Sequence, residues 1–581
     1  RAEPRAWPLP AWLHGAFDRL PGWLEGTASV RALRGARLRW NPTELRLATG
    51  LVRSTDRRDT YLRPVTTAGE PPRRVTGESD LWRSSATVGL RPFGALGARV
   101  DLTTVRDLRQ YGDTGAAAVA ATRARASLLG RDIGFERERF MTTSVTLEPV
   151  VTAWLRPRVE VVTRHDLLRD PDRAPVLVGA DGAFMSSSAP GALDADPLAR
   201  DALARAIVGD PTLDPRLLDV RTIDPWAIDS ATGRPWAERL RLGRRLGNER
   251  TVTAGMQLDY AHALAVATDG AGPAAWLDGV LEPLEVSWVR GLRAAYDALP
   301  WAPGLGFQLG LGGVGDFRHL HGMPAASAGV GTQLTVAQTV RLAYGVTAVA
   351  RVSRSRALNW TRQPFVADDD GQRADEGSQL SFPDLTLRWS WRAGGPGEVV
   401  SDAGVSARVL HTLQRNVALA DAGPLSETRA TLVRSYPLTG SITWGALRLT
   451  TAGGISLTMR EDTLPGTVIR SSSRDASAEV GRPFRLPARF GLRSDVRTRA
   501  SYQQARTRSV AASLSTAGRE SRLVDNGRRS FSLNADADVA EDLTFVLQAS
   551  RILTFDDNLG RRFAQTVLTA ALQMRFFAGP L

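Results

Sequence analysis

The last fifty residues of the chain alternate apolar and polar side chains over three successive segments. These segments run from Phe531 to Val539, from Leu543 to Ser550 and from Ala564 to Phe576. Strict alternation puts apolar side chains on one face of a β-strand and polar side chains on the other. A strand needs about 9–11 residues to cross a hydrocarbon layer at a tilt, and these segments are of that length. The pattern predicts a transmembrane β-barrel.

The same alternation recurs along most of the chain, so the prediction extends to one large unit. The fold class we predict is all-β: a large antiparallel transmembrane β-barrel of about twenty strands, with one partly helical extramembrane insertion. The predicted domains are a Pro/Trp-rich lead-in segment at 1–27, barrel strands at 28–166, an extramembrane insertion or plug-like loop at 167–248, and barrel strands at 249–581.

The sequence predicts the local structure of three further segments. Asp196-Pro197 predicts the start of a short helix inside the insertion, with the carboxylate as N-cap and proline in the first turn. Leu305, Phe307, Leu309 and Leu311 alternate with Gly306, Gln308, Gly310 and Gly312, which predicts a close-packed strand. Arg53 to Arg74 is expected to be an arginine-rich polar loop.

Composition excludes several other classes. No run of about 18 apolar residues occurs, so helical membrane spans are not expected. There is no cysteine, which excludes disulfides and thiolate sites. Apolar residues make up 43% of the chain, a share that suits a barrel or a soluble protein equally well.

The chain carries a formal charge of +13, and all 74 of its basic residues are arginine. Strong basic charge often indicates nucleic-acid binding. Here the arginines are spread along the chain and alternate with apolar residues, so no nucleic-acid partner is expected. In a barrel lumen they would pair with Asp and Glu, as Asp495 could with Arg493 and Arg497, or favour the passage of anions.

The alternation also predicts which way individual side chains face. The apolar side chains are expected to contact outer-membrane lipid. The predicted lipid-facing residues are Leu543, Phe545, Leu547, Leu568, Leu572, Met574, Phe576, Trp389 and Trp391. The predicted lumen-facing residues are Gln565, Gln573, Arg575, Arg341, Arg351, Arg388, Arg493, Arg497 and Arg499. Trp389 and Trp391 would belong to the aromatic girdle at a membrane interface.

Few residues form patterns typical of a catalytic or metal-binding site. His319 and His321 form an H-x-H pair, but a zinc ion needs three or four converging ligands. Asp368 to Asp370, followed by Asp375 and Glu376, lacks the ligand spacing of an EF-hand. Walker, nucleophile-elbow and H-E-x-x-H motifs do not occur. We therefore expect no enzyme activity, no cofactor and no metal site.

Four stretches resemble the SprA-type outer-membrane translocon of type IX secretion and gliding motility, a family of cell-surface proteins. The stretches are Leu38–Leu45 with Arg53–Tyr61, Gly130–Gly134 with Ala153–Pro157, Leu305–Gly310, and Ser381–Thr386. The resemblance implies the C-terminal barrel portion of such a channel, with plug or shuttle proteins and secreted protein substrates as partners. Those translocons are several times longer, so the chain would be a fragment or a reduced relative.

Two other hypotheses stay open on sequence alone. The first is a porin or channel for smaller solutes, and the second is a soluble secreted all-β binding protein. A translocon or a porin would lie in the outer membrane and would need an export signal, which the sequence from Arg1 does not include.

Overall fold

The fold is described from a computed structural model of the chain. It describes residues 7–8, 37–38, 42–60, 73–112, 114–149, 151–173, 175–178, 184–187, 220, 223–229, 233–269, 273–362, 372–392, 399–420, 423–445, 447–485, 495–513, 520–540 and 543–574.

Long strands dominate these residues, and they form one large antiparallel sheet of 18 strands with the strand order of a barrel. The strands are β3 (Pro42–Thr60), β4 (Arg73–Phe93), β5 (Leu96–Asp107), β8 (Phe135–Leu147), β9 (Leu155–Arg169), β15 (Arg244–Leu258), β16 (Leu284–Leu299), β19 (Ser327–Leu342), β20 (Val346–Arg362), β21 (Gln372–Arg392), β22 (Asp402–Ala420), β23 (Gly423–Trp444), β24 (Leu449–Leu464), β25 (Thr467–Phe484), β26 (Val496–Ser513), β27 (Glu520–Ala540), β28 (Leu543–Asp556) and β29 (Arg561–Met574). The predicted all-β fold is confirmed, with 18 described strands where about twenty were expected.

The chain divides into two compact units. Unit 1 holds residues 1–255, 288–332 and 357–375, and unit 2 holds residues 256–287, 333–356 and 376–581. The predicted domain limits are not tested by this division and stay a prediction.

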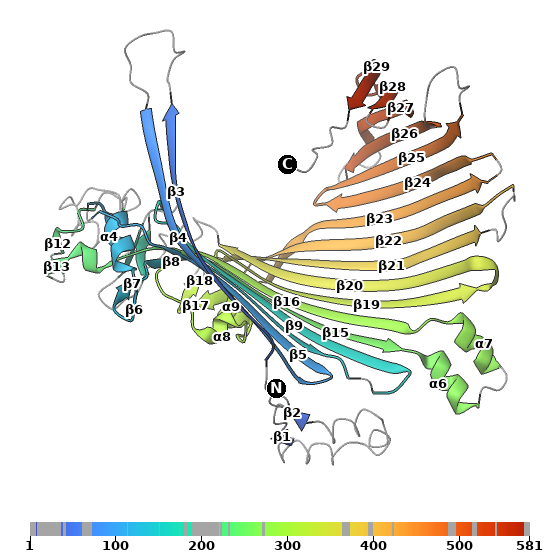
Figure 1. Cartoon of the computed structure of the whole chain (residues 1–581). Helices are drawn as coiled ribbons and strands as arrows, with labels where there is room; N and C mark the ends of the chain where they lie inside the picture. The colour runs from blue at the N-terminus through green and yellow to red at the C-terminus, as the bar shows by residue number, and fades with distance from the viewer. Residues whose placement is uncertain are drawn as a thin grey trace, which may run out of the picture. The chain divides into compact units, whose positions relative to one another are not determined.

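In unit 2, β22 to β29 lie side by side in chain order (Figure 1), each paired antiparallel with the next. The two rims formed by the strand ends are named after β29. The Met574 edge is the rim where β29 ends, and the Arg561 edge is the opposite rim, where β29 begins. At the second edge, Leu464 pairs with Thr467 across the two-residue turn Pro465-Gly466. Gly466 has a φ of 77°, which a type II turn requires after proline. Turn chemistry therefore fixes the register of this hairpin.

Unit 2 also contains two short helices, α6 (Tyr260–Ala267) and α7 (Pro273–Val280), which pack against each other. The Asp259 side chain caps α6 by accepting the main-chain N–H of His262 at 3.0 Å.

In unit 1, β3, β4, β5, β8 and β9 are paired in that order. β5 ends at Asp107, whose buried carboxylate accepts hydrogen bonds from the Arg109 guanidinium at 2.7 Å and the Tyr111 hydroxyl at 2.9 Å. Burial, together with the nearby Asp107 carboxylate, raises the pKa of the Tyr111 hydroxyl, so the phenol stays protonated and keeps donating. These bonds hold the strand end against the segment that follows.

The residues that follow Tyr111 contribute to a small hydrophobic core in unit 1. Helix α4 (Ala116–Arg123) lies with the short strands β6, β7, β12 and β13 (Figure 1). The bounds of these strands are Ser127–Leu128, Arg131–Asp132, Ile228–Asp229 and Arg234–Pro235. Phe135, Leu177, Trp236 and Leu240 are buried against α4. The helix expected after Asp196 lies outside the described residues.

Residues 300–326 connect β16 to β19 and pack on the sheet of unit 1. This segment contains α8 (Leu305–Gln308), α9 (Val314–Arg318) and the hairpin of β17 (His319–Leu320) with β18 (Met323–Pro324). The strand predicted from Leu305 to Leu311 is therefore wrong. Gly310 has a φ of 67°, and a Cβ there would lie 2.9 Å from the Thr163 side chain, so glycine serves a turn packed on β9. The apparent alternation arises because Gly306, Gln308 and Gly310 separate the apolar residues.

The predicted loop from Arg53 to Arg74 is also largely wrong. β3 continues to Thr60 and pairs with β4 from Arg73 onward, so only 61–72 lies between the two strands. The Arg53 guanidinium donates to Asp80 across this pair at 2.6 Å. Cross-strand charge pairs can support a strand that is polar on both faces, and composition alone did not reveal this pairing.

Among the helices of the described residues, none has both the length and the apolar character needed to cross a membrane.

Candidate functional site

One face of the unit 2 sheet carries large apolar side chains that are exposed. The register places them together: Leu438 lies opposite Ile455, Tyr502 opposite Phe531, and Phe545 opposite Leu572. We call this set the apolar belt, and it comprises Leu438, Ile442, Ile455, Val480, Tyr502, Phe531, Leu533, Phe545, Leu568 and Leu572. A contiguous exposed apolar surface of this kind marks contact with lipid or with a partner protein.

The apolar belt occupies the part of its face nearer the Met574 edge. Towards the Arg561 edge, the same face changes to exposed arginines. These are Arg434, Arg474, Arg506, Arg508, Arg529 and Arg551. An apolar band that ends in cationic side chains is the profile of a strand leaving hydrocarbon for a polar interface.

The opposite face, which we call the polar face, is built from small hydroxyl side chains. Ser501 and Ser532 lie 2.7 Å apart, and Ser471 and Ser509 lie 2.8 Å apart, each pair spanning two neighbouring strands. Such bonds satisfy the hydroxyl groups without filling the space in front of the sheet. The polar face can therefore line a water-filled space.

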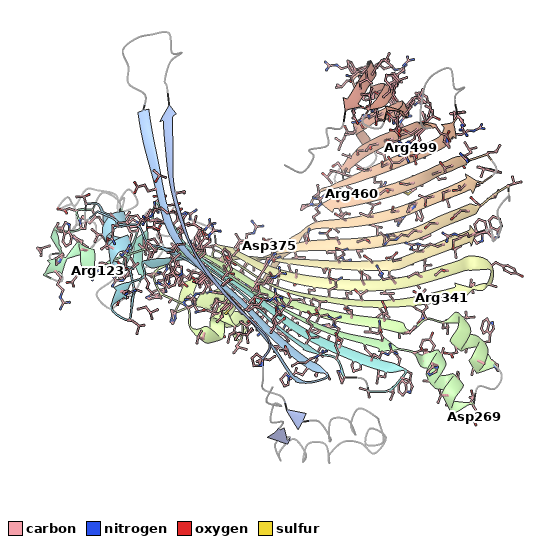
Figure 2. All side chains as sticks on the ribbon, viewed as in Figure 1. Arg123, Asp269, Arg341, Asp375, Arg460 and Arg499 are labelled. Carbon is pink, nitrogen blue, oxygen red and sulfur yellow. The ribbon has the colours of Figure 1, made fainter. Side chains whose placement is uncertain are left out.

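Charged residues on the polar face occur mostly as ion pairs. Arg497 contacts Asp536 at 2.8 Å, and Arg499 contacts Glu479 at 2.9 Å. Asp462 accepts from Arg429 at 3.0 Å and from Arg460 at 2.8 Å. Figure 2 shows Arg460 and Arg499 along this sheet among many other charged side chains. The pairing leaves little net charge on this face.

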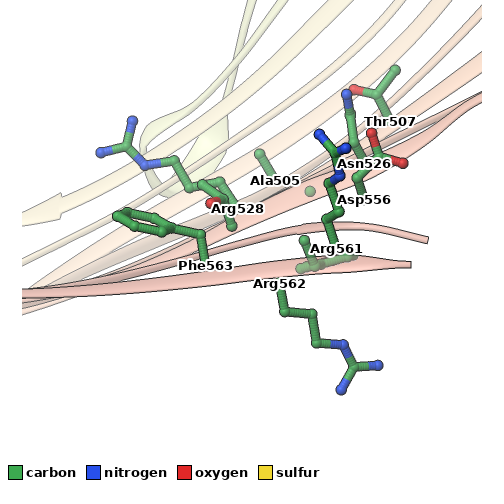
Figure 3. A pocket seen from close by; sticks show the side chains of 11 residues that line it. Ala505, Thr507, Asn526, Arg528, Asp556, Arg561, Arg562 and Phe563 are labelled. Carbon is green, nitrogen blue, oxygen red and sulfur yellow. The ribbon is translucent and has the colours of Figure 1, made fainter. Parts of the chain in front are cut away.

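One hollow of the polar face lies at the Arg561 edge, between β26 and β29. It has a volume of about 700 Å³. Arg561 lies beside Asn526 and Asp556 in this hollow, whereas Arg562 points away from them (Figure 3). The two neighbouring arginines thus project from opposite faces of β29, as alternation requires.

The structure brings together most of the predicted lipid-facing residues. Leu543, Phe545 and Leu547 pair directly with Met574, Leu572 and Ala570, so they share the face of Leu568. Trp389 and Trp391 are exposed and lie one residue away from Arg388 and Arg392 on β21. Phe576 lies outside the described residues. Which face meets lipid stays a prediction.

The predicted lumen-facing residues fall on several strands. Gln565 and Gln573 lie opposite Ile552 and Thr544, on the polar face with Arg497 and Arg499. Arg341 forms an ion pair with Glu282. Arg351 and Arg388 are exposed. Arg493 and Arg575 lie outside the described residues.

The ion pair suggested between Asp495 and Arg497 is wrong. Asp495 instead contacts Arg448 at 3.2 Å. Asp495 precedes the first residue of β26, and Arg497 instead pairs across the strands with Asp536 at 2.8 Å.

The described residues contain no group of three or more His, Asp or Glu side chains arranged to hold a metal ion. His319 lies in β17 and His321 in the turn that follows, where its φ is 51°. Glu376 accepts from Arg356 at 2.9 Å, while Asp368 to Asp370 lie outside the described residues.

Sequence reasoning missed a group of arginines in unit 1: Arg106, Arg169, Arg241 and Arg244, which line one cavity. They come from separate strands and segments, so no local spacing could have found them.

No family model matches the chain, and neither does any curated protein. Among solved structures, the pyoverdine outer membrane receptor FpvA from Pseudomonas aeruginosa PAO1 bound to pyoverdine is 10% identical, with a TM-score of 0.27, over 92% of this chain and 72% of that chain. The siderophore receptor PirA from Acinetobacter baumannii is 7% identical, with a TM-score of 0.21, over 85% of this chain and 71% of that chain. Similarity at this level carries no inference about the function of this chain.

Proposed function

We propose that the chain is a non-enzymatic outer-membrane β-barrel that forms a channel. The exposed apolar belt on one face of long antiparallel strands, with the polar face opposite, carries this proposal. In lipid the belt would face the acyl chains, and the polar face would line an aqueous lumen. A soluble secreted protein would have to cover the belt with another layer, and these leucines and phenylalanines are exposed.

The strand number supports the passage of solutes. Barrels of 16–18 strands leave an aqueous channel, and the described sheet has 18 strands. Protein translocation of the SprA type, with plug or shuttle partners, is the finer form of the proposal and rests on the sequence resemblance. The two forms differ in the width of the lumen.

Single-channel recording from the purified chain in planar lipid bilayers tests the proposal. A channel should give discrete current steps, and a translocating pore should give much larger steps than a porin-like pore. Folded chain that inserts into the bilayer and passes no current would refute the channel.

The double substitution Arg497→Gln and Arg499→Gln should shift the channel towards cations. Removing both arginines leaves Asp536 and Glu479 without their counter-charges on the polar face. The cation-to-anion permeability ratio should rise roughly two- to fivefold, because a unit charge at close range in water is worth about 1 kcal/mol. Reversal potentials in a salt gradient measure this ratio.

Arg551→Gln is the matched control, because Arg551 lies opposite Phe531 on the face of the apolar belt. It should leave the permeability ratio unchanged. Equal shifts in the double variant and the control would refute the assignment of faces.

A further inference from the structure

Five of the eleven residues that line a cavity of about 470 Å³ in unit 1 are arginines. They come from β5, from α4 (where Figure 2 labels Arg123), from β9, from the short strand Leu240–Arg241, and from the start of β15. The five arginines are Arg106, Arg123, Arg169, Arg241 and Arg244. Among the described residues, none of them forms an ion pair.

Glu136 is the one carboxylate among the described lining residues, and it is already engaged. Its two oxygens accept from the Arg139 guanidinium at 2.8 and 3.0 Å. Arg139 also donates to the Gln308 side chain at 2.9 Å. The Glu136 carboxylate is therefore shared with a sixth arginine outside the lining, and the cavity keeps a large positive surplus.

The arginines that donate hydrogen bonds here give them to main-chain oxygens. Arg241 donates to the carbonyl of Glu238 at 2.7 Å, and Arg244 donates to the carbonyl of Pro300. The buried Nε atoms of Arg169 and Arg244 have no hydrogen-bond partner among the residues that the structure describes, and Arg169 is only 9% exposed. A buried guanidinium with an unused donor is costly unless an acceptor occupies the space in front of it.

We propose that this cavity binds a phosphate group. A phosphate carries up to two negative charges and oxygens on several sides, which matches converging guanidinium groups better than a single carboxylate does. The volume exceeds that of one phosphate, so there is room for a second phosphate or for the carrier of the first.

The position of the cavity bears on where the phosphate comes from. The register links Leu47, Ala86, Leu102, Met141 and His165 across five strands, so these residues share one face. Arg106 and Arg169 extend from the same face, four residues along β5 and β9. Leu47 on this face is exposed, so a phosphate headgroup of a lipid and a soluble phosphate are both sources to be tested.

Isothermal titration of the full chain in detergent, at constant ionic strength, tests the proposal with two probes. Sodium pyrophosphate represents soluble phosphate, and phosphatidic acid in mixed micelles represents a lipid headgroup. Binding of both assigns recognition to the phosphate group itself, binding of phosphatidic acid alone assigns a lipid, and binding of pyrophosphate alone assigns a soluble ligand. If neither probe binds the unaltered chain, the proposal is overturned.

The double variant Arg169→Gln and Arg244→Gln should bind the effective probe at least about tenfold more weakly, because each charged hydrogen bond contributes substantially. Arg164→Gln, an exposed position on the other face of β9, is the control and should bind normally. Heat-modifiable migration on gels verifies that each variant is folded. Unchanged binding by the folded double variant would also overturn the site.

Discussion

Arginine in place of Leu568 should destabilise the folded chain in lipid by about 2–4 kcal/mol, if this face lies near the bilayer midplane. Leu568 is 72% exposed in β29 and lies directly opposite Ala549. In water such an exposed leucine would tolerate arginine with little change. In hydrocarbon the guanidinium loses its hydration, so the free energy of unfolding should fall.

The matched control for this experiment is Gln565→Arg, three residues away on the same strand. Gln565 lies on the polar face, opposite Ile552, so arginine there should cost little. Guanidinium unfolding of both variants in lipid vesicles, followed by tryptophan fluorescence, gives the two midpoints. Similar midpoints for the two variants would show that the lipid-facing assignment is wrong.

The side-chain facing of the strands near the C-terminus could be predicted from the sequence. Phe531 to Phe576 alternate with a period of two, and nothing but alternation is needed to place Phe545 and Leu572 on one face. The apolar belt follows from the same rule applied to each strand. Pairing then brings the predicted residues together, since antiparallel neighbours share a face.

Features that depend on distant contacts could not be predicted. The arginine cavity draws Arg106, Arg169 and Arg244 from three strands that are far apart in sequence. The ion pair of Arg497 with Asp536 depends on the register between β26 and β27, which alternation alone leaves open. Local pattern therefore gave the faces of the strands but not the partners across them.

The segment 300–326 shows the same limit. Its alternating Leu305, Phe307, Leu309 and Leu311 suggested a strand, yet Phe307 is buried while Leu305 and Leu311 are exposed. Burial here follows from packing on β9 and β16 rather than from a period of two. The aromatic cluster that anchors the segment is visible only in the folded chain.

Alanine in place of Phe317 should release residues 300–326 from the sheet of unit 1. Phe317 is 1% exposed, its ring lies 5.5 Å from that of Phe307, and its carbonyl accepts the Tyr296 hydroxyl at 3.0 Å. Removing a buried phenyl ring costs about 3–5 kcal/mol, so the docked form of this segment should lose about that much stability.

Hydrogen exchange measures this opening, because amides of a segment that opens locally exchange at a rate set by its own free energy of opening. Amides in 300–326 should exchange a hundredfold faster or more in Phe317→Ala, given a tenfold change per 1.4 kcal/mol. Leu311→Ala, at a position 72% exposed, is the control and should exchange as the unaltered chain does. Equal protection in both variants would mean that main-chain bonds, such as that from Ala325 to the Arg318 carbonyl at 2.8 Å, hold the segment instead of the aromatic core.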